Sequence, residues 1–238
     1  SLLLARWAVR PVELAWERQR QFVADASHEL KTPLTVILSN AQLLGEAEGD
    51  PALRSRLREN ILSMSARMRS LVESLLDLAR VDAGLAGQTL SRVDLSRVVS
   101  EAILPFEPLF YERGLALSSS VEPGIAVKGS AERLSQAVGV LLDNAQKYAS
   151  PGGSVSVTLS RQGGRHCLIA VENSGEPLSP AERRDIFKRF YRVDSARAMN
   201  HSYGLGLAIA ARIAEAHRGR IWAESSGGIN TFYFTIPI

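Results

Sequence analysis

The chain has 238 residues, 45% of them hydrophobic and 22% charged, so its composition is that of an ordinary globular protein long enough for two modest domains. Its formal net charge is only +3, and no long basic run alternates with aromatic residues, so nucleic-acid binding has little support. A single cysteine, Cys167, excludes an intrachain disulfide, and no stretch reaches the ~20 apolar residues of a membrane span.

The first nine residues, SLLLARWAV, fit either the inner end of a membrane span or the start of an amphipathic helix, and composition alone does not choose between them. Arginines at positions 6, 10, 18 and 20 interrupt or follow this segment, as is typical of the cytoplasmic side of a span. On the first of these alternatives, residues 1–11 would be a juxtamembrane segment that follows a span before residue 1 and anchors the parent protein in the cell membrane.

Two long helices are predicted in the first third of the chain. The first runs from Pro11 to about Leu44 and is ended by GEAEGD at 45–50, and Pro51 suits the first turn of the second. Apolar residues recur at steps of four and three in both, which is coiled-coil spacing: Leu30, Leu34, Ile37, Ala41 and Leu44, then Leu53, Leu57, Ile61, Met64, Met68, Leu71, Leu75 and Leu78. Because a lone hairpin has too small a core, we predict a four-helix bundle, and hence a homodimer, through residues 12–80.

After Arg80 the small residues AGLAGQ at 83–88 indicate a linker, and mixed strand and helix patterns follow. We expect strands near 92–95, 116–119, 155–160, 167–171, 220–224 and 231–236, and helices near 96–112, 131–149, 180–187 and 204–217. Helices mixed with mostly hairpin-connected strands favour an α+β sandwich with the helices on one sheet face. The predicted organisation is an all-α helical hairpin at 12–82, a linker at 83–90 and an α+β domain at 91–238.

The first helix places a histidine and a carboxylate just before a proline, in SHELKTPL at 27–34. His28 lies about 160° around the helix from Leu30, so it should face solvent rather than the packed seam. An unprotonated imidazole is nucleophilic at neutral pH, and Glu29 or a nearby carbonyl could accept its other N–H. Because Pro33 lacks an N–H, a helical bond to the Glu29 carbonyl cannot form, and we expect a bend one turn beyond His28.

This string closely resembles the phosphoacceptor box of sensor histidine kinases. A lone histidine near a proline would more simply be a solvated surface residue beside a kink, but the full string favours the functional interpretation. The resemblance implies that His28 accepts the γ-phosphoryl group of ATP, with Glu29 taking or polarising the other ring proton. It implies that Thr32, one turn later, positions water for the reverse dephosphorylation. It also implies a dimerisation and histidine-phosphotransfer domain at 12–82 joined to a catalytic, Bergerat-type ATP-binding domain at 91–238.

The run LLDNAQKY at 141–148 resembles the N box of the same kinases. The amide oxygen of Asn144 is a hard ligand suited to Mg²⁺. Lys147 can face the same nucleotide as a point charge for phosphate, and Tyr148 offers a flat face for stacking a base. Where the family commonly has another asparagine one turn earlier, this chain has Val140, which cannot coordinate a metal.

VENSG at 171–175 resembles the first glycine box, which ends a predicted strand. Asn173 stands where the family has an aspartate that accepts a hydrogen bond from the adenine amino group, and Gly175 follows it. An amide oxygen can still accept, but it lacks the charge-assisted strength of a carboxylate, a difference of about 1 kcal/mol. Glu176 and Pro177 occupy positions where a second glycine is usual.

IFKRFYR at 186–192 resembles the F box and ends with Arg192, a further nucleotide-binding candidate. YGLGLAI at 203–209 resembles the second glycine box, where backbone N–H groups at a helix start can approach phosphate oxygens: Gly204, Leu205 and Gly206. His201 and Ser202 precede it where the family usually has a further glycine. A third glycine segment at 227–232 contains Thr231, which could donate to a phosphate.

Together these boxes imply an ATP- and Mg²⁺-dependent protein-histidine kinase, the cytoplasmic half of a membrane sensor. It would phosphorylate itself on His28, pass the group to an aspartate of a response-regulator receiver domain, and also dephosphorylate that partner. The alternative is a phosphatase-biased or non-catalytic signalling scaffold, motivated by Asn173, Glu176, Val140 and the missing glycine before Tyr203. An ATPase of the same nucleotide fold in DNA repair or chaperone action explains neither the His28 box nor the heptads.

Overall fold

The computed structural model describes residues 2–47, 49–82, 90–193 and 202–238, without the side chains of residues 2–12, 14, 15 and 18. The chain divides into two compact units, residues 1–75 and residues 76–238. Apart from Leu90, the predicted linker at 83–90 lies outside the described residues. Within the described ranges, no helix is both long enough and apolar enough to cross a membrane.

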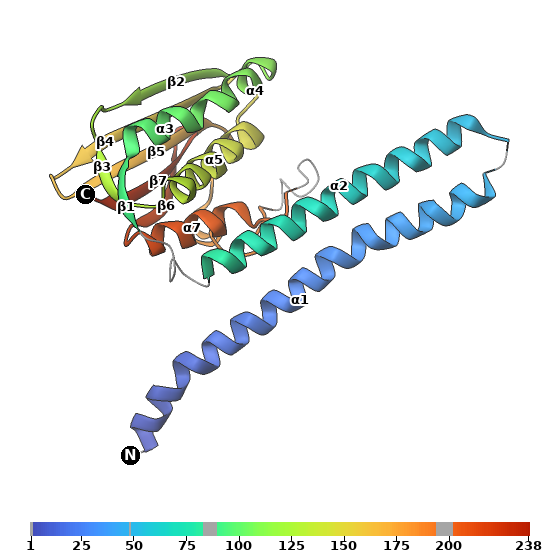
Figure 1. The fold of residues 1–238 in the computed structure, drawn as a ribbon, viewed down its shortest axis with the longest axis horizontal. Helices are drawn as coiled ribbons and strands as arrows, with labels where there is room; N and C mark the ends of the chain where they lie inside the picture. Colours follow the sequence, from blue (N-terminus) through green and yellow to red (C-terminus); the bar gives the residue numbers. More distant parts are fainter. Residues whose placement is uncertain (1, 48, 83–89, 194–201) are drawn as a thin grey trace. The chain divides into compact units, whose positions relative to one another are not determined.

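The helical hairpin consists of α1 (Leu2–Glu46) and α2 (Pro51–Asp82), so both predicted helices are confirmed (Figure 1). α1 continues through Pro33 as a single helix, so the proline does not divide it. α2 begins at Pro51, where a missing N–H costs no helical hydrogen bond. The Oδ1 atom of Asp50 accepts the backbone N–H of Leu53 at 3.0 Å and so caps this start.

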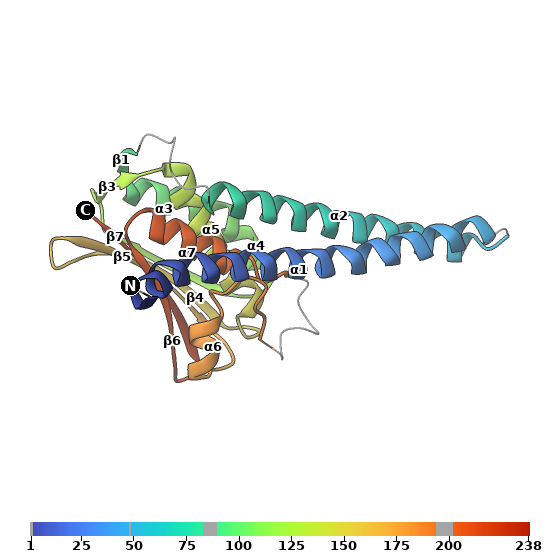
Figure 2. The same ribbon diagram turned by 90° about the horizontal axis from the view of Figure 1, so that it is seen from below.

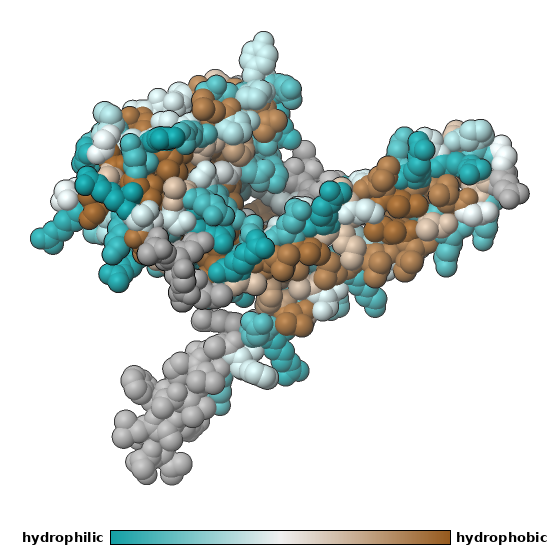
Figure 3. Space-filling model, viewed as in Figure 1, coloured by the Kyte–Doolittle hydropathy of each residue, from teal (hydrophilic) through white to brown (hydrophobic). Residues whose placement is uncertain are grey.

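The hairpin leaves much of its apolar surface uncovered. Leu57 and Leu71 are buried, but Leu38 is 56% exposed and Leu62 is 63% exposed. Figure 3 shows brown, apolar side chains gathered along both helices. The exposed large apolar residues of residues 1–75 include Trp16, Val23, Leu34, Leu38, Leu43, Leu53, Leu62 and Val72. A soluble surface rarely keeps so extended an apolar patch uncovered, so this face is suited to a protein partner.

The second unit contains a five-stranded sheet in the order β2-β4-β5-β7-β6. Its strands are β2 (Ala116–Val121), β4 (Ser154–Gln162), β5 (His166–Ser174), β6 (Arg220–Ser226) and β7 (Ile229–Pro237). β4, β5, β7 and β6 pair antiparallel, whereas β2 pairs parallel to β4. Two short strands, β1 (Ser91–Asp94) and β3 (Ala126–Gly129), form a separate antiparallel pair, of which the sequence predicts only β1.

Helices cover one face of this sheet, which confirms the predicted α+β sandwich. They are α3 (Leu95–Ile103), the 3₁₀ turn η1 (Leu104–Phe106), α4 (Glu107–Glu112), α5 (Ala131–Tyr148), α6 (Pro180–Asp185) and α7 (Gly206–Ala216). α3, α5 and α7 form the layer over the sheet (Figures 1 and 2). Pro105 and Pro108 fall in η1 and at the start of α4, where the predicted interruption of the helix occurs.

The core lies between the sheet and this helical layer. Alternate strand residues point into it, so Val157, Ile169 and Phe234 are at most 1% exposed. The thiol of Cys167 is also fully buried there, and loss of solvation raises its pKa to about 11. This cysteine is therefore a small apolar core residue rather than a reactive group.

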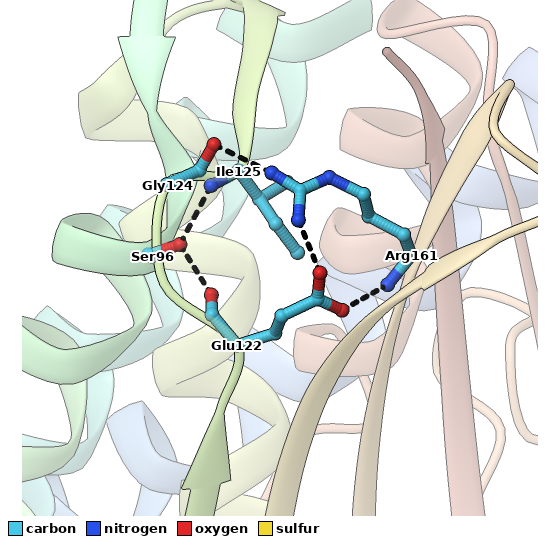
Figure 4. Close-up of polar contacts among 5 residues, drawn as sticks. All are labelled: Ser96, Glu122, Gly124, Ile125 and Arg161. Carbon is cyan, nitrogen blue, oxygen red and sulfur yellow. Dashed lines mark hydrogen bonds and ion pairs between the residues drawn. The ribbon is translucent and has the colours of Figure 1, made fainter.

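A polar cluster ties the turn between β2 and β3 to its neighbours (Figure 4). The hydroxyl of Ser96 in α3 donates to the Glu122 carbonyl at 2.6 Å and accepts the Ile125 N–H at 3.0 Å. Arg161 of β4 donates its backbone N–H to the Glu122 carboxylate at 2.8 Å, its guanidinium pairs with the same carboxylate, and its Nη2 reaches the Gly124 carbonyl. The bond from the Arg161 backbone lowers the pKa of Glu122, with the guanidinium adding to the effect.

Candidate phosphoacceptor and nucleotide sites

His28 lies on α1 with its side chain exposed to solvent, as the helical spacing predicts. Glu29, the next residue, is partly buried, and Thr32 is exposed one turn further along. The Oγ1 atom of Thr32 donates to the His28 backbone carbonyl at 3.5 Å. Thus the imidazole is accessible to a large substrate, and a hydroxyl stands one helical turn away from it.

The C-terminal half of α5 carries the residues of the N box. Asn144 is partly buried, and Lys147 forms an ion pair with Asp143 at 2.5 Å. The hydroxyl of Tyr148 shares a hydrogen bond of 3.2 Å with the hydroxyl of Ser202, which comes from the segment before α7. Asn144, Lys147 and Tyr148 therefore lie close together at the C-terminal end of α5, beside the segment that leads to the second glycine box.

Glycines allow the neighbouring segments to approach this region closely. Gly175 follows β5, and a Cβ atom there would lie 2.8 Å from the Tyr148 carbonyl oxygen. Gly204 has a φ of 68°, and a Cβ atom there would lie 2.4 Å from the Tyr191 carbonyl oxygen in the F box. Larger residues would be strained at both positions, so the glycines are required by the local packing.

α7 begins at Gly206, two residues later than predicted. Leu205 is its N-cap residue, is 2% exposed, and provides no side-chain cap. The first backbone N–H groups of an eleven-residue helix can therefore serve an anionic group. A Cβ at Gly206 would lie 3.3 Å from the Cγ1 atom of Val140, so the start of α7 packs against α5.

Asn173 and Asn230 face each other across β5 and β7, where they are paired in register. They are 1% and 5% exposed, and the Oδ1 atom of each is buried and accepts no hydrogen bond from any described residue. Thr231 is paired instead with Glu172 and Glu224, on the opposite face of the sheet from Asn230. Arg192 is partly buried after the F box. Asn173 therefore lies beside Asn230, and Thr231 lies on the other face of the sheet.

A buried histidine fastens α5 to α7. His217 is 4% exposed, and its Nε2 atom accepts the backbone N–H of Ser130 at 3.1 Å. Its Nδ1 atom therefore carries the proton and donates to the Ile213 carbonyl at 2.8 Å. Burial lowers the pKa of His217, so the ring is neutral. A Cβ at Gly129 would lie 2.8 Å from this ring, which leaves no room beside it.

Residues 18–84 match the family model of the His Kinase A (phospho-acceptor) domain. Residues 129–238 match the model of the histidine kinase-, DNA gyrase B- and HSP90-like ATPases. The chain belongs to the sensor histidine kinases of two-component systems. The two matched regions are those that carry the exposed His28 and the buried asparagine pair.

Similar sensor histidine kinases cover most of this chain. It is 34% identical over 223 residues to the sensor protein DltS of Streptococcus agalactiae, and the match covers 94% of this chain and 55% of DltS. It is 39% identical over 216 residues to the kinase/phosphatase MprB of Mycolicibacterium smegmatis, and the match covers 86% of this chain and 42% of MprB. The chain thus spans about half the length of the curated relatives that it matches.

A solved structure of histidine kinase ThkA in complex with response regulator protein TrrA has the same fold. The match covers 100% of this chain and 67% of the ThkA chain, with a TM-score of 0.75 and 19% sequence identity. At this level of identity the likeness supports only the fold, which is the arrangement of the elements within each unit.

An ionic cluster at the end of α2 is not marked by any pattern in the sequence of this histidine kinase. Asp82 accepts hydrogen bonds from Arg189 of the F box at 2.5 Å and from Arg212 of α7 at 2.7 Å. Nearby, Asp77 accepts from Gln136 of α5 at 3.0 Å. The partners of Asp82 lie more than 100 residues away in the sequence, and no local pattern marks them.

Proposed function

We propose that this chain is the kinase core of a sensor histidine kinase that phosphorylates its own His28 with ATP. The observation that carries the proposal is the exposed imidazole of His28 within the SHELKTPL box of a family-matched helix. The ATPase-family domain supports the use of ATP. Residues 12–82 would serve as the dimerisation and phosphotransfer domain, and residues 91–238 as the catalytic domain.

The residues around the C-terminal end of α5 fit a nucleotide. The buried Oδ1 atoms of Asn173 and Asn230, which have no donor among the described residues, suit the amino group of adenine. The N-terminus of α7 at Gly206, which has no side-chain cap, suits the phosphates of the nucleotide. Lys147 and Arg192 supply positive charge, and Tyr148 an aromatic face. The amide oxygen of Asn144 suits Mg²⁺, which binds through few protein oxygens plus phosphates and would supply charge neutralisation there.

The chemical step is an in-line displacement at the γ-phosphorus of ATP. The unprotonated ring nitrogen of His28 forms the new N–P bond, the bond from phosphorus to the β–γ bridging oxygen breaks, and ADP leaves with that electron pair. Glu29 accepts or polarises the proton on the other ring nitrogen of His28. The protein contributes mainly by positioning the two groups and by stabilising charge.

The exposed apolar face of the hairpin supports a homodimer in which two hairpins form a four-helix bundle. The phosphoryl group of His28 would then pass to an aspartate of a response-regulator receiver domain, and Thr32 would orient water for dephosphorylation of that partner. ThkA, in the solved complex, binds a response regulator protein. We further propose that the chain is the cytoplasmic part of a protein anchored in the cell membrane.

The test is incubation of the purified chain with γ-labelled ATP and Mg²⁺, scoring acid-labile, base-stable label on the protein. Label is expected on the wild type and absent from His28→Gln. His166→Gln is the matched control, because it removes another exposed imidazole, and it should be labelled as the wild type is. A folded dimer that takes no label would favour the phosphatase-biased or scaffold alternative, which is motivated by Asn173, Glu176, Val140 and the missing glycine before Tyr203.

A further inference from the structure

β6 is an edge strand of the five-stranded sheet, because within the described residues it pairs only with β7. The Gly175 N–H donates to the Gly228 carbonyl at 2.9 Å, so even-numbered residues of this register turn their main-chain groups toward β5 and odd-numbered ones toward β6. Trp222 is paired with an odd-numbered residue and therefore bonds to β7. The N–H and C=O groups of its neighbours, Ile221 and Ala223, point outward from the sheet.

This outward edge is open over a short stretch. Among the described residues, none forms a hydrogen bond with the outward main-chain groups of Ile221 and Ala223. At the next outward residue, Ser225, the Oγ atom accepts the Leu178 N–H at 2.9 Å, so the chain after β5 covers that end. An edge with unused donors and acceptors is a template on which a further strand can form.

A groove of about 410 Å³ lies along the open edge, and α6, which packs beside β6, supplies its other wall (Figure 2). The ring of Phe187 meets that of Phe232 edge-on, with 6.5 Å between centroids, so this wall lies on the core side of β6. Trp222 lines the groove from the opposite face, because side chains alternate along a strand. The residues of the α6 wall share one helical face: Pro180, Arg183, Arg184 and Phe187.

The α6 wall carries two cations without an anionic partner. The side chains of Arg183 and Arg184 form no ion pair with any described residue, and the buried Nε atom of Arg183 has no acceptor there. The acidic residues of the same helix are engaged elsewhere. Glu182 closes the capping box, and Asp185 pairs with Lys188 at 2.6 Å. The groove therefore offers guanidinium groups to carboxylates that come from outside the chain.

We propose that an extended acidic segment of a partner protein adds to the edge of β6 as a further strand. Its main chain pairs with Ile221 and Ala223, its carboxylates on one face meet Arg183 and Arg184, and apolar side chains on its other face cover Trp222. The main-chain bonds supply affinity, and the alternation of acidic and apolar residues supplies selectivity. The groove contains none of the candidate nucleotide ligands, so the inference does not rest on the proposed function.

The test uses an acetylated and amidated peptide of alternating glutamate and valine. It is titrated into the full chain with Trp7→Phe and Trp16→Phe, so that the fluorescence comes from Trp222 in the groove. A saturable change in fluorescence is expected. A peptide with lysine in place of each glutamate should bind at least about tenfold more weakly, because it brings cations to a basic wall.

Methyl groups on the peptide nitrogens distinguish strand addition from attraction between charges. In an added strand, alternate residues turn their N–H groups toward β6 and the others turn theirs toward solvent. Methylation of one alternate set of nitrogens should therefore abolish binding, and methylation of the other set should leave it nearly unchanged. Both methylated peptides have the same charge, so only main-chain pairing separates them.

A variant tests the charged wall. Arg183→Gln combined with Arg184→Gln should weaken binding of the acidic peptide about tenfold. Arg165→Gln is the matched control, because it removes an exposed arginine from the turn between β4 and β5, and it should bind as the unaltered chain does. Unchanged affinity of the folded double variant would overturn the inference.

Two other results would also overturn it, and neither depends on the folding of a groove variant. One is the lack of a saturable change up to about 1 mM peptide, a concentration that reaches even weak complexes. The other is equal binding of the two methylated peptides, which would show that the main chain of β6 takes no part.

Discussion

Lowering the pH from 7.5 to 5.5 should destabilise the second unit through His217. The folded state holds this imidazole neutral, because its Nε2 accepts the Ser130 N–H and burial lowers its pKa below the ordinary value of 6.5. The unfolded chain therefore takes up the proton first as the pH falls. The stabilisation is fully present above pH 6.5 and is lost below it, by at most about 1.4 kcal/mol per pH unit. That loss corresponds to a fall of about 0.5 to 1 M in the urea midpoint per pH unit.

The assay is urea unfolding at pH 7.5, 6.5 and 5.5, followed by tryptophan fluorescence. Replacing Trp7 and Trp16 with phenylalanine leaves Trp222 as the single tryptophan of the chain, so the signal reports the second unit. His217→Gln should lose the extra pH dependence, because it has no ionisable group, whereas the exposed His166 changed to Gln should keep it. An equally steep fall in His217→Gln and in the wild type would refute the assignment to His217.

Three further changes test the sites. Thr32→Ala should keep autophosphorylation and lower dephosphorylation of the response regulator, and equal loss of both activities would contradict its role. Asn144→Ala should abolish Mg²⁺-dependent nucleotide binding, as measured by titration with and without Mg²⁺, while its circular dichroism spectrum stays that of the wild type; unchanged affinity would exclude it as a ligand. Asp82→Asn should lower stability by about 0.5–1 kcal/mol in urea, because its ion pairs with Arg189 and Arg212 are partly exposed, and the difference should shrink in 1 M NaCl. A difference that salt does not change would show that charge is not its origin.

The helical hairpin could be predicted because the sequence patterns that specify its two helices are local. A heptad that runs from Leu53 to Leu78 repeats in steps of three and four, and Pro51 marks its start. In the first helix, the seam that contains Leu30 placed His28 on the solvent side, which the structure confirms. Pro105 and Pro108 likewise predicted the interruption of the helix between α3 and α4.

The remaining features depend on contacts between distant segments. β3 has only four residues, too few for an alternating pattern, and β2 pairs parallel to β4 only through a crossover that contains α5. Asn230 becomes a neighbour of Asn173 through the register of β5 and β7, which resemblance to a glycine segment does not specify. The partners of Asp82 are set by tertiary packing in the same way.

The buried thiol of Cys167 makes this kinase convenient for site-directed probes. With a pKa of about 11 and no exposed surface, it should resist maleimides and other alkylating reagents at neutral pH in the folded chain. A cysteine introduced at exposed Ser39 of α1 would then be labelled selectively, without removal of the native one. A spin label or fluorophore attached there, paired with a second at an exposed position of residues 76–238, would report whether the distance between the two units changes when ATP is added, as the proposed phosphorylation of His28 requires.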